Sequence, residues 1–218
     1  MSGGSGLRRF VGRAPQPPPA PAPDALAAEA AVELCEMCGT PAGPRHGHVV
    51  DTEHRSLMCA CRACFLLFTR PDAGGGRFRA VPERCLHDPD RPLTTPEWES
   101  LGIPVGAVFF LRGADGLAAF YPSPAGATEC LLDLDAWDRL GADHPLLAAA
   151  APDVEAILIH STAGSVACFL VPIDLCYQLV GLVRLHWKGF DGGQEAHERI
   201  DEFFADIRAR ATTYEPEE

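Results

Sequence analysis

The chain has 218 residues, 47% of them hydrophobic, and a formal net charge of −12. This length and hydrophobic content suffice for one ordinary domain with its own core plus a small module. The segment after residue 100 contains eighteen acidic and seven basic residues. This excess of negative charge argues against a nucleic-acid-binding protein, because such binding depends on cationic side chains that neutralise phosphates. A near-neutral N-terminal module on an acidic domain instead favours a protein partner.

The first residues are rich in Gly, Ser, Pro and Ala, so we expect a disordered tail over 1–33, with a short helix over 25–34. Arg8 and Arg9 precede Phe10 as in a twin-arginine export signal, but proline-rich sequence follows instead of an apolar stretch. No run approaches the roughly 20 apolar residues of a membrane span. These features predict a cytoplasmic protein without a membrane span.

Two CxxC motifs define the next segment, 34–70. They are Cys35-x-x-Cys38 and Cys61-x-x-Cys64, and Gly39 follows the first of them. A pair of such turns directs four thiolates at one point, which suits tetrahedral Zn²⁺. Residues 48–59 between the motifs have the strand-turn-strand character of a zinc ribbon. The sequence therefore predicts a zinc-ribbon module with Cys35, Cys38, Cys61 and Cys64 as metal ligands.

Two alternatives concern the ligands and the metal. Cys59 alternates onto the side of Cys61 in an extended arm and is an alternate ligand, or else a small buried thiol. His46, His48 and His54 lie in the same loop and could substitute for a cysteine ligand, but they are interpreted as solvated loop residues. Iron is the alternative to zinc, because four thiolates also hold a rubredoxin-type iron, although Phe65 rather than glycine follows the second motif.

After a proline-broken connector over 71–100, the pattern changes to an α+β domain over 101–212 and an acidic tail over 213–218. Apolar runs at 105–112, 117–121, 154–160 and 166–172 predict two β-hairpins. Helices are expected near Asp133, after Asp174 as N-cap, and over 195–210. Consecutive strand pairs predict an antiparallel sheet with the helices packed on one face, so the fold class is α+β.

Motifs for catalysis are absent from the sequence, which contains no GxSxG, phosphate loop or HExxH pattern. His160 closes a strand and is the nearest approach to a catalytic residue. Cys168 and Cys176 are expected in the core, whereas Cys85 and Cys130 are isolated. No catalytic residue and no organic cofactor is therefore assigned, and a non-enzymatic role is favoured.

Two stretches, CEMCGTP with RSLMCACRACFLLF and the later VPIDLCYQLVGLVRLHWKGFDGG, resemble an uncharacterised bacterial family known from actinobacteria. The resemblance spans about residues 34–211. It implies a place among the accessory genes of high-affinity [NiFe] hydrogenases, with hydrogenase subunits or maturation proteins as partners. The expected function is a non-catalytic zinc-ribbon accessory protein for assembly or maturation of a [NiFe] hydrogenase, and the alternative is a rubredoxin-like iron-thiolate electron-transfer protein.

Overall fold

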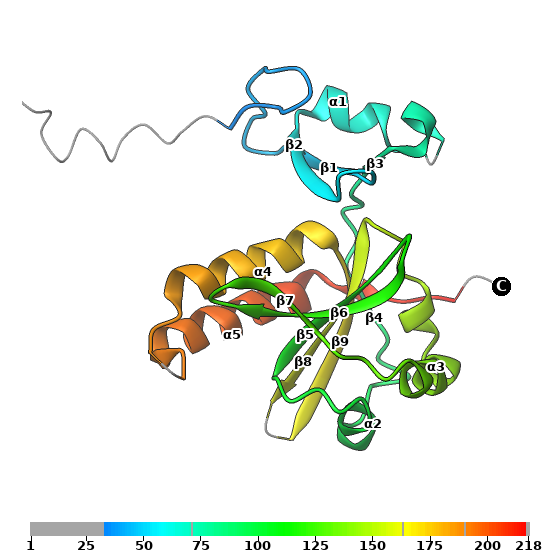
Figure 1. Ribbon diagram of the computed structural model, residues 1–218, viewed down its shortest axis with the longest axis vertical. Coiled ribbons are helices and arrows are strands. Elements are labelled where there is room, and N and C mark those ends of the chain that lie inside the picture. The colour runs from blue at the N-terminus through cyan, green and yellow to red at the C-terminus, as the bar shows by residue number, and fades with distance from the viewer. Residues whose placement is uncertain (1–32, 71, 163, 190, 217–218) are drawn as a thin grey trace, which may run out of the picture. The chain divides into compact units, whose positions relative to one another are not determined.

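The computed structural model describes residues 33–70, 72–162, 164–189 and 191–216 (Figure 1). The segment Glu33–Glu218 forms one compact unit. Apart from Glu33, the tail predicted over 1–33 lies outside the described residues, as does most of the helix expected over 25–34. None of the described helices has the length and apolar character needed to cross a membrane.

A three-stranded antiparallel sheet in the order β2-β1-β3 forms the ribbon. Its strands are β1 (Gly47–Asp51), β2 (Ser56–Ala60) and β3 (Phe78–Ala80). The predicted strand-turn-strand corresponds to β1 and β2. The third strand, β3, lies within the residues predicted as connector, so the ribbon sheet reaches beyond residue 70.

The turn between β1 and β2 is held by the buried Asp51 carboxylate. It accepts hydrogen bonds from the N–H groups of Glu53 (3.0 Å) and His54 (3.1 Å). Arg77, next to β3, adds a charged hydrogen bond to Asp51 at 2.6 Å. A buried carboxylate is stable only when it is paired in this way, so Asp51 ties all three strands together.

One face of the ribbon sheet packs on the short helix α1 (Arg62–Leu67). Val49 and Ala60 are fully buried there, together with Phe65 of α1 and Cys35. Gly47 leaves room for the Phe65 ring, because a Cβ at residue 47 would lie 2.3 Å from Phe65 Cδ2. Among the described residues these four are the buried members of the ribbon's own core, and partly buried side chains, including Met37, Met58, Phe68 and Phe78, pack around them.

A seven-stranded sheet in the order β10-β4-β9-β8-β5-β6-β7 forms the rest of the fold. All its strand pairs are antiparallel except the two-residue pair of β4 with β10. Both predicted hairpins are present, as β5–β6 and β8–β9, and β7 extends the first into a meander. The strands are β4 (Leu86–His87), β5 (Ala107–Gly113), β6 (Gly116–Ser123), β7 (Gly126–Cys130), β8 (Glu155–Thr162), β9 (Ser165–Pro172) and β10 (Thr212–Thr213).

Side-chain caps begin α2 and α3, whereas α1, α4 and α5 begin without one. Asp133 accepts a hydrogen bond from the Ala136 N–H at the start of α3, as predicted. Asp174 was predicted as the N-cap of the next helix, but that prediction is wrong because α4 already begins at Ile173 and Asp174 lies in its first turn. The helices are α2 (Thr95–Ser100), α3 (Leu134–Asp143), α4 (Ile173–His186) and α5 (Gly193–Arg210), with short 3-10 turns at Ala73–Gly76 and Pro145–Ala148.

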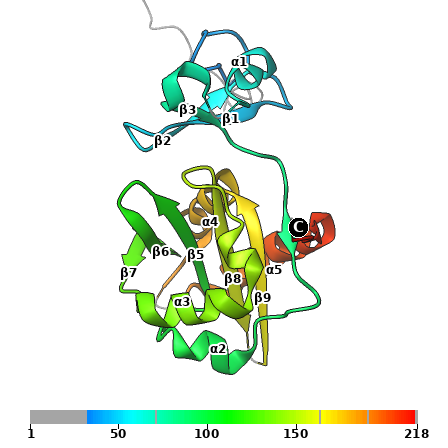
Figure 2. The ribbon, with the colours of Figure 1, turned by 90° about the vertical axis from the view of Figure 1, so that its right-hand side faces the viewer.

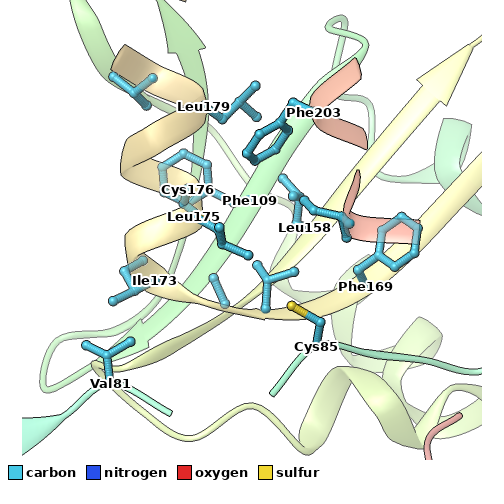
Figure 3. Close-up of a cluster of buried hydrophobic side chains, with 14 of the residues drawn as sticks. Val81, Cys85, Phe109, Leu158, Phe169, Ile173, Leu175, Cys176, Leu179 and Phe203 are labelled. Atoms are coloured by element: carbon cyan, nitrogen blue, oxygen red, sulfur yellow. The ribbon is translucent and has the colours of Figure 1, made fainter. Parts of the chain in front are cut away.

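Apolar side chains cover both faces of the large sheet. Alternation along β8 sends Leu158 toward α4 and α5, where Leu179 and Phe203 gather with it and Phe109 (Figure 3). Ile157 and its neighbours on the other face pack on α2 and α3. The α+β class is confirmed. The predicted helical layer on one face of the sheet corresponds to α4 and α5. The helices α2 and α3 form a further layer on the opposite face (Figure 2).

Candidate metal centre

Each pair of cysteines is presented by a short local turn. In the first, the Cys35 N–H donates to the Thr40 carbonyl and the Gly39 N–H donates to the Cys35 carbonyl, both at 2.8 Å. Gly39 has φ of 72°, a conformation that glycine adopts without strain. In the second, Cys61 directly follows β2 and Cys64 lies in the first turn of α1. Each turn therefore holds two sulfurs on one side of the backbone.

The two turns meet, and one sulfur from each of Cys35, Cys38, Cys61 and Cys64 lies within 4.8 Å of the others. The Sγ atoms of Cys38 and Cys61 are 3.7 Å apart. Two sulfurs on a tetrahedral zinc ion, each at about 2.3 Å, are about 3.8 Å apart. A disulfide would need about 2.05 Å. The spacing thus fits a shared metal ion, and the metal-ligand assignment stays a prediction.

Backbone groups are arranged to stabilise negative sulfur. Burial raises the pKa of Cys35, but hydrogen bonds from the backbone N–H groups of Cys61 and Cys38 outweigh it and lower the pKa from 9.0 to about 6. In the same cluster, hydrogen bonding to Cys38 and burial raise the pKa of Cys64 to about 12. Four thiolates this close repel one another unless a cation lies between them. The cluster is therefore compatible with metal binding.

The donor set determines what chemistry such an ion can support. Four sulfur ligands complete a tetrahedral shell and leave no position for a water molecule or substrate, which is typical of structural zinc. Cys35 is buried, whereas Cys38 is exposed and its Sγ lies 3.0 Å from Thr40 Oγ1.

Cys59 lies outside this cluster. The prediction that Cys59 and Cys61 share one side assumed that both lie in the same strand. The strand β2 ends at Ala60, so Cys61 lies outside it and the alternation does not apply to this pair. Cys59 is instead the cross-strand partner of His48 on β1. The structure groups Cys59 with His46 and His48, half-buried beside the ribbon sheet, and not with the four other cysteines. Only His54 is an exposed turn residue of the kind expected.

The remaining sequence candidates belong mostly to the cores. Cys176 of α4 is buried in the core on one face of the large sheet, and Cys168 packs against the core on the opposite face, as expected. His160 stacks on Phe204 with ring centroids 3.8 Å apart, and burial lowers its pKa. It also borders a cavity of about 650 Å³ that Trp187 helps to line. Because its ring is stacked closely on Phe204, we interpret His160 as a residue that contributes to core packing.

Sequence reasoning missed the pairing of His48 with Cys59. The available signal was the alternation of His46 and His48, which places both on one face of an extended strand. Which residues of β2 oppose them depends on the register of the hairpin, and that could not be read from spacing alone.

Comparison with known proteins gives one family and no closer relative. No curated protein and no solved structure matches the chain significantly. The sequence model of DUF5947, described as a family of unknown function, matches residues 34–211. This range covers both the ribbon and the α+β domain and agrees with the extent of the resemblance noted from the sequence, but the match carries no link to hydrogenases or to actinobacteria. The chain belongs to DUF5947, a family of unknown function.

Proposed function

We propose that this protein is a non-catalytic zinc-ribbon adaptor in which one Zn²⁺ ion on Cys35, Cys38, Cys61 and Cys64 holds the ribbon in a shape that a partner protein recognises. The clustering of four thiols within 4.8 Å of one another, with Cys38 and Cys61 at the sulfur–sulfur spacing of a tetrahedral zinc ion, is the observation that carries the proposal. The ribbon's own core contains few side chains, so bound metal would contribute much of its stability, about 10–16 kcal/mol in comparable small zinc domains. A reducing compartment such as the cytoplasm would keep these thiols free for metal.

Exposed apolar side chains beside the centre support a docking role. Leu66 and Leu67 of α1 directly follow the second cysteine pair and are 52% and 65% exposed. Neighbouring exposed leucines on one short helix are more typical of a contact surface than of a solvated one. The metal would anchor this helix through Cys61 and Cys64, so ion binding and presentation of the leucines are coupled.

The partner we propose is a [NiFe] hydrogenase subunit or one of its maturation proteins. Only the family resemblance of the sequence supports this choice. Under this proposal, deletion of the gene lowers hydrogen uptake without reducing transcription of the hydrogenase genes. The Leu67→Asp variant should keep its zinc and fail to restore uptake, whereas Ala63→Asp, an exposed change on the same helix, tests whether added charge alone is harmful. Full uptake in the deletion strain would refute the hydrogenase role.

Metal analysis tests the adaptor proposal directly. Protein purified anaerobically should contain zinc, be colourless in visible light, and lose zinc in Cys38→Ser. Cys130→Ser, at a half-buried thiol on β7, serves as the matched control and should retain the metal content of the wild type. Stoichiometric iron with visible thiolate-to-iron absorption would instead establish the rubredoxin-like electron-transfer alternative.

A further inference from the structure

A second group of metal-binding side chains lies on the ribbon sheet. His48 of β1 and Cys59 of β2 are directly opposed across the antiparallel pair, and His46 precedes His48 by two residues. One ligand atom from each of the three lies within 4.8 Å of the other two. Directly opposed side chains in an antiparallel pair point to the same face, so this group is set by the strand register.

The histidine rings are oriented by oxygen acceptors at Nδ1. His48 Nδ1 lies 2.9 Å from Asp174 Oδ2, and His46 Nδ1 lies 3.0 Å from the Gly43 carbonyl oxygen. An ionised carboxylate and a carbonyl only accept hydrogen bonds, so each Nδ1 carries the proton and donates it. In a neutral imidazole, Nε2 then keeps its lone pair. Metal-binding histidines show this same arrangement, in which a carboxylate or carbonyl oxygen fixes the ring and the tautomer.

The donor atoms indicate which ion would bind. Two imidazole nitrogens and one thiolate suit borderline transition metals such as Zn²⁺ and do not suit Mg²⁺ or Ca²⁺, which prefer oxygen ligands. Donors around a tetrahedral zinc are about 3.3–3.6 Å apart. The three ligand atoms lie within 4.8 Å of one another, so they would need to approach by no more than about 1.5 Å to reach this spacing.

Glu33 supplies a further carboxylate at this group. Its Oε2 lies 3.3 Å from His46 Nε2. A carboxylate oxygen facing a nitrogen lone pair at this distance is repelled unless a proton or a cation is present. A metal ion bound to His46 Nε2 would lie within reach of this carboxylate, which could serve as its fourth ligand.

We infer that His46, His48 and Cys59 form a second transition-metal site of the zinc class, distinct from the four-cysteine centre. Its three protein ligands leave a fourth position for Glu33, water or an exchangeable ligand, whereas the four-cysteine centre is complete. Ions at sites with an open position exchange or react more readily than ions in closed sulfur shells. This site would therefore hold the more labile of two metal ions.

Cobalt titration of the full-length protein tests the inference. After brief EDTA treatment, Co²⁺ should bind to a total of two equivalents per chain, with separate thiolate-to-cobalt absorption for the weak and the tight ion. His48→Ala and Cys59→Ser should each bind one equivalent and keep the absorption of the four-cysteine centre, which also shows that the ribbon is folded. His197→Ala, at an exposed histidine on α5, is the control and should still bind two.

Asp174→Asn gives an independent measurement, because it leaves all three ligands in place. Loss of an outer carboxylate partner typically weakens metal binding 10–100-fold, and we expect that loss for the weak ion alone. A wild-type total of one equivalent, or two equivalents in both His48→Ala and Cys59→Ser, would overturn the inference. Loss of both ions in all three variants would also overturn it, because these residues would then only support the ribbon fold.

Discussion

Replacement of Cys61 by Ser should unfold the ribbon while the large sheet stays folded. The ribbon's own core has two sizeable buried side chains, Val49 and Phe65, which at about 1.5–3 kcal/mol each contribute roughly 3–6 kcal/mol. Val50 and Val81 add burial in the larger core. Partly buried Met37, Met58, Phe68 and Phe78 add further apolar contacts. Metal binding, at about 10–16 kcal/mol in similar domains, is at least comparable to all of these apolar contributions together. Removal of one of the four thiolates should therefore remove most of the ribbon's stability.

Hydrogen exchange measured segment by segment is the assay. In Cys61→Ser, peptides covering β1 and β2 should exchange at rates close to those of an unfolded chain, because opening needs little free energy once the ion is lost. Peptides covering β8 and β9 should keep their protection, since their core does not include the centre. Cys130→Ser should match the wild type in both. Protected β1 and β2 amides in a zinc-free Cys61→Ser protein would refute the reasoning.

Three further predictions concern other parts of the fold. Hydrogen bonds from Thr94 lower the pKa of Glu97 from 4.5 to about 2, so its stabilisation is complete above pH 4.5 and is lost as pH falls toward 2; Glu97→Gln should flatten that part of a Tm-against-pH curve, and an unchanged curve would contradict this. Gly47→Ala places a Cβ against Phe65 and should destabilise the ribbon by about 1–3 kcal/mol, lowering zinc affinity roughly 5- to 150-fold in chelator competition; unchanged affinity would show that the ring moves freely. His160→Ala removes a stacked ring and should lower Tm yet still complement a deletion strain, whereas a folded variant that fails to complement would indicate an enzymatic role.

Much of the fold followed from local patterns. The apolar runs of β5, β6, β8 and β9 were predictable because alternation and bounding turns are properties of neighbouring residues. Asp133 was predictable as a cap for the same reason. The third ribbon strand β3 was not, since three residues within a segment with prolines and glycines become a strand only through pairing with β1. The second helical layer escaped prediction because continuous apolar runs do not reveal which faces are covered.

The sequence by itself determined the four-cysteine cluster, because a CxxC turn places two sulfurs together by local geometry and two such turns leave few other arrangements for four thiols. Tertiary structure decided the role of Cys59. Hairpin register set it opposite His48, and α4 brought Asp174 to the His48 ring from 126 residues away. Sequence spacing indicates only contacts within one turn of the chain. Strand register and long-range packing depend on how whole helices and strands bury their apolar faces. The second group of ligands could therefore be identified only from the tertiary structure.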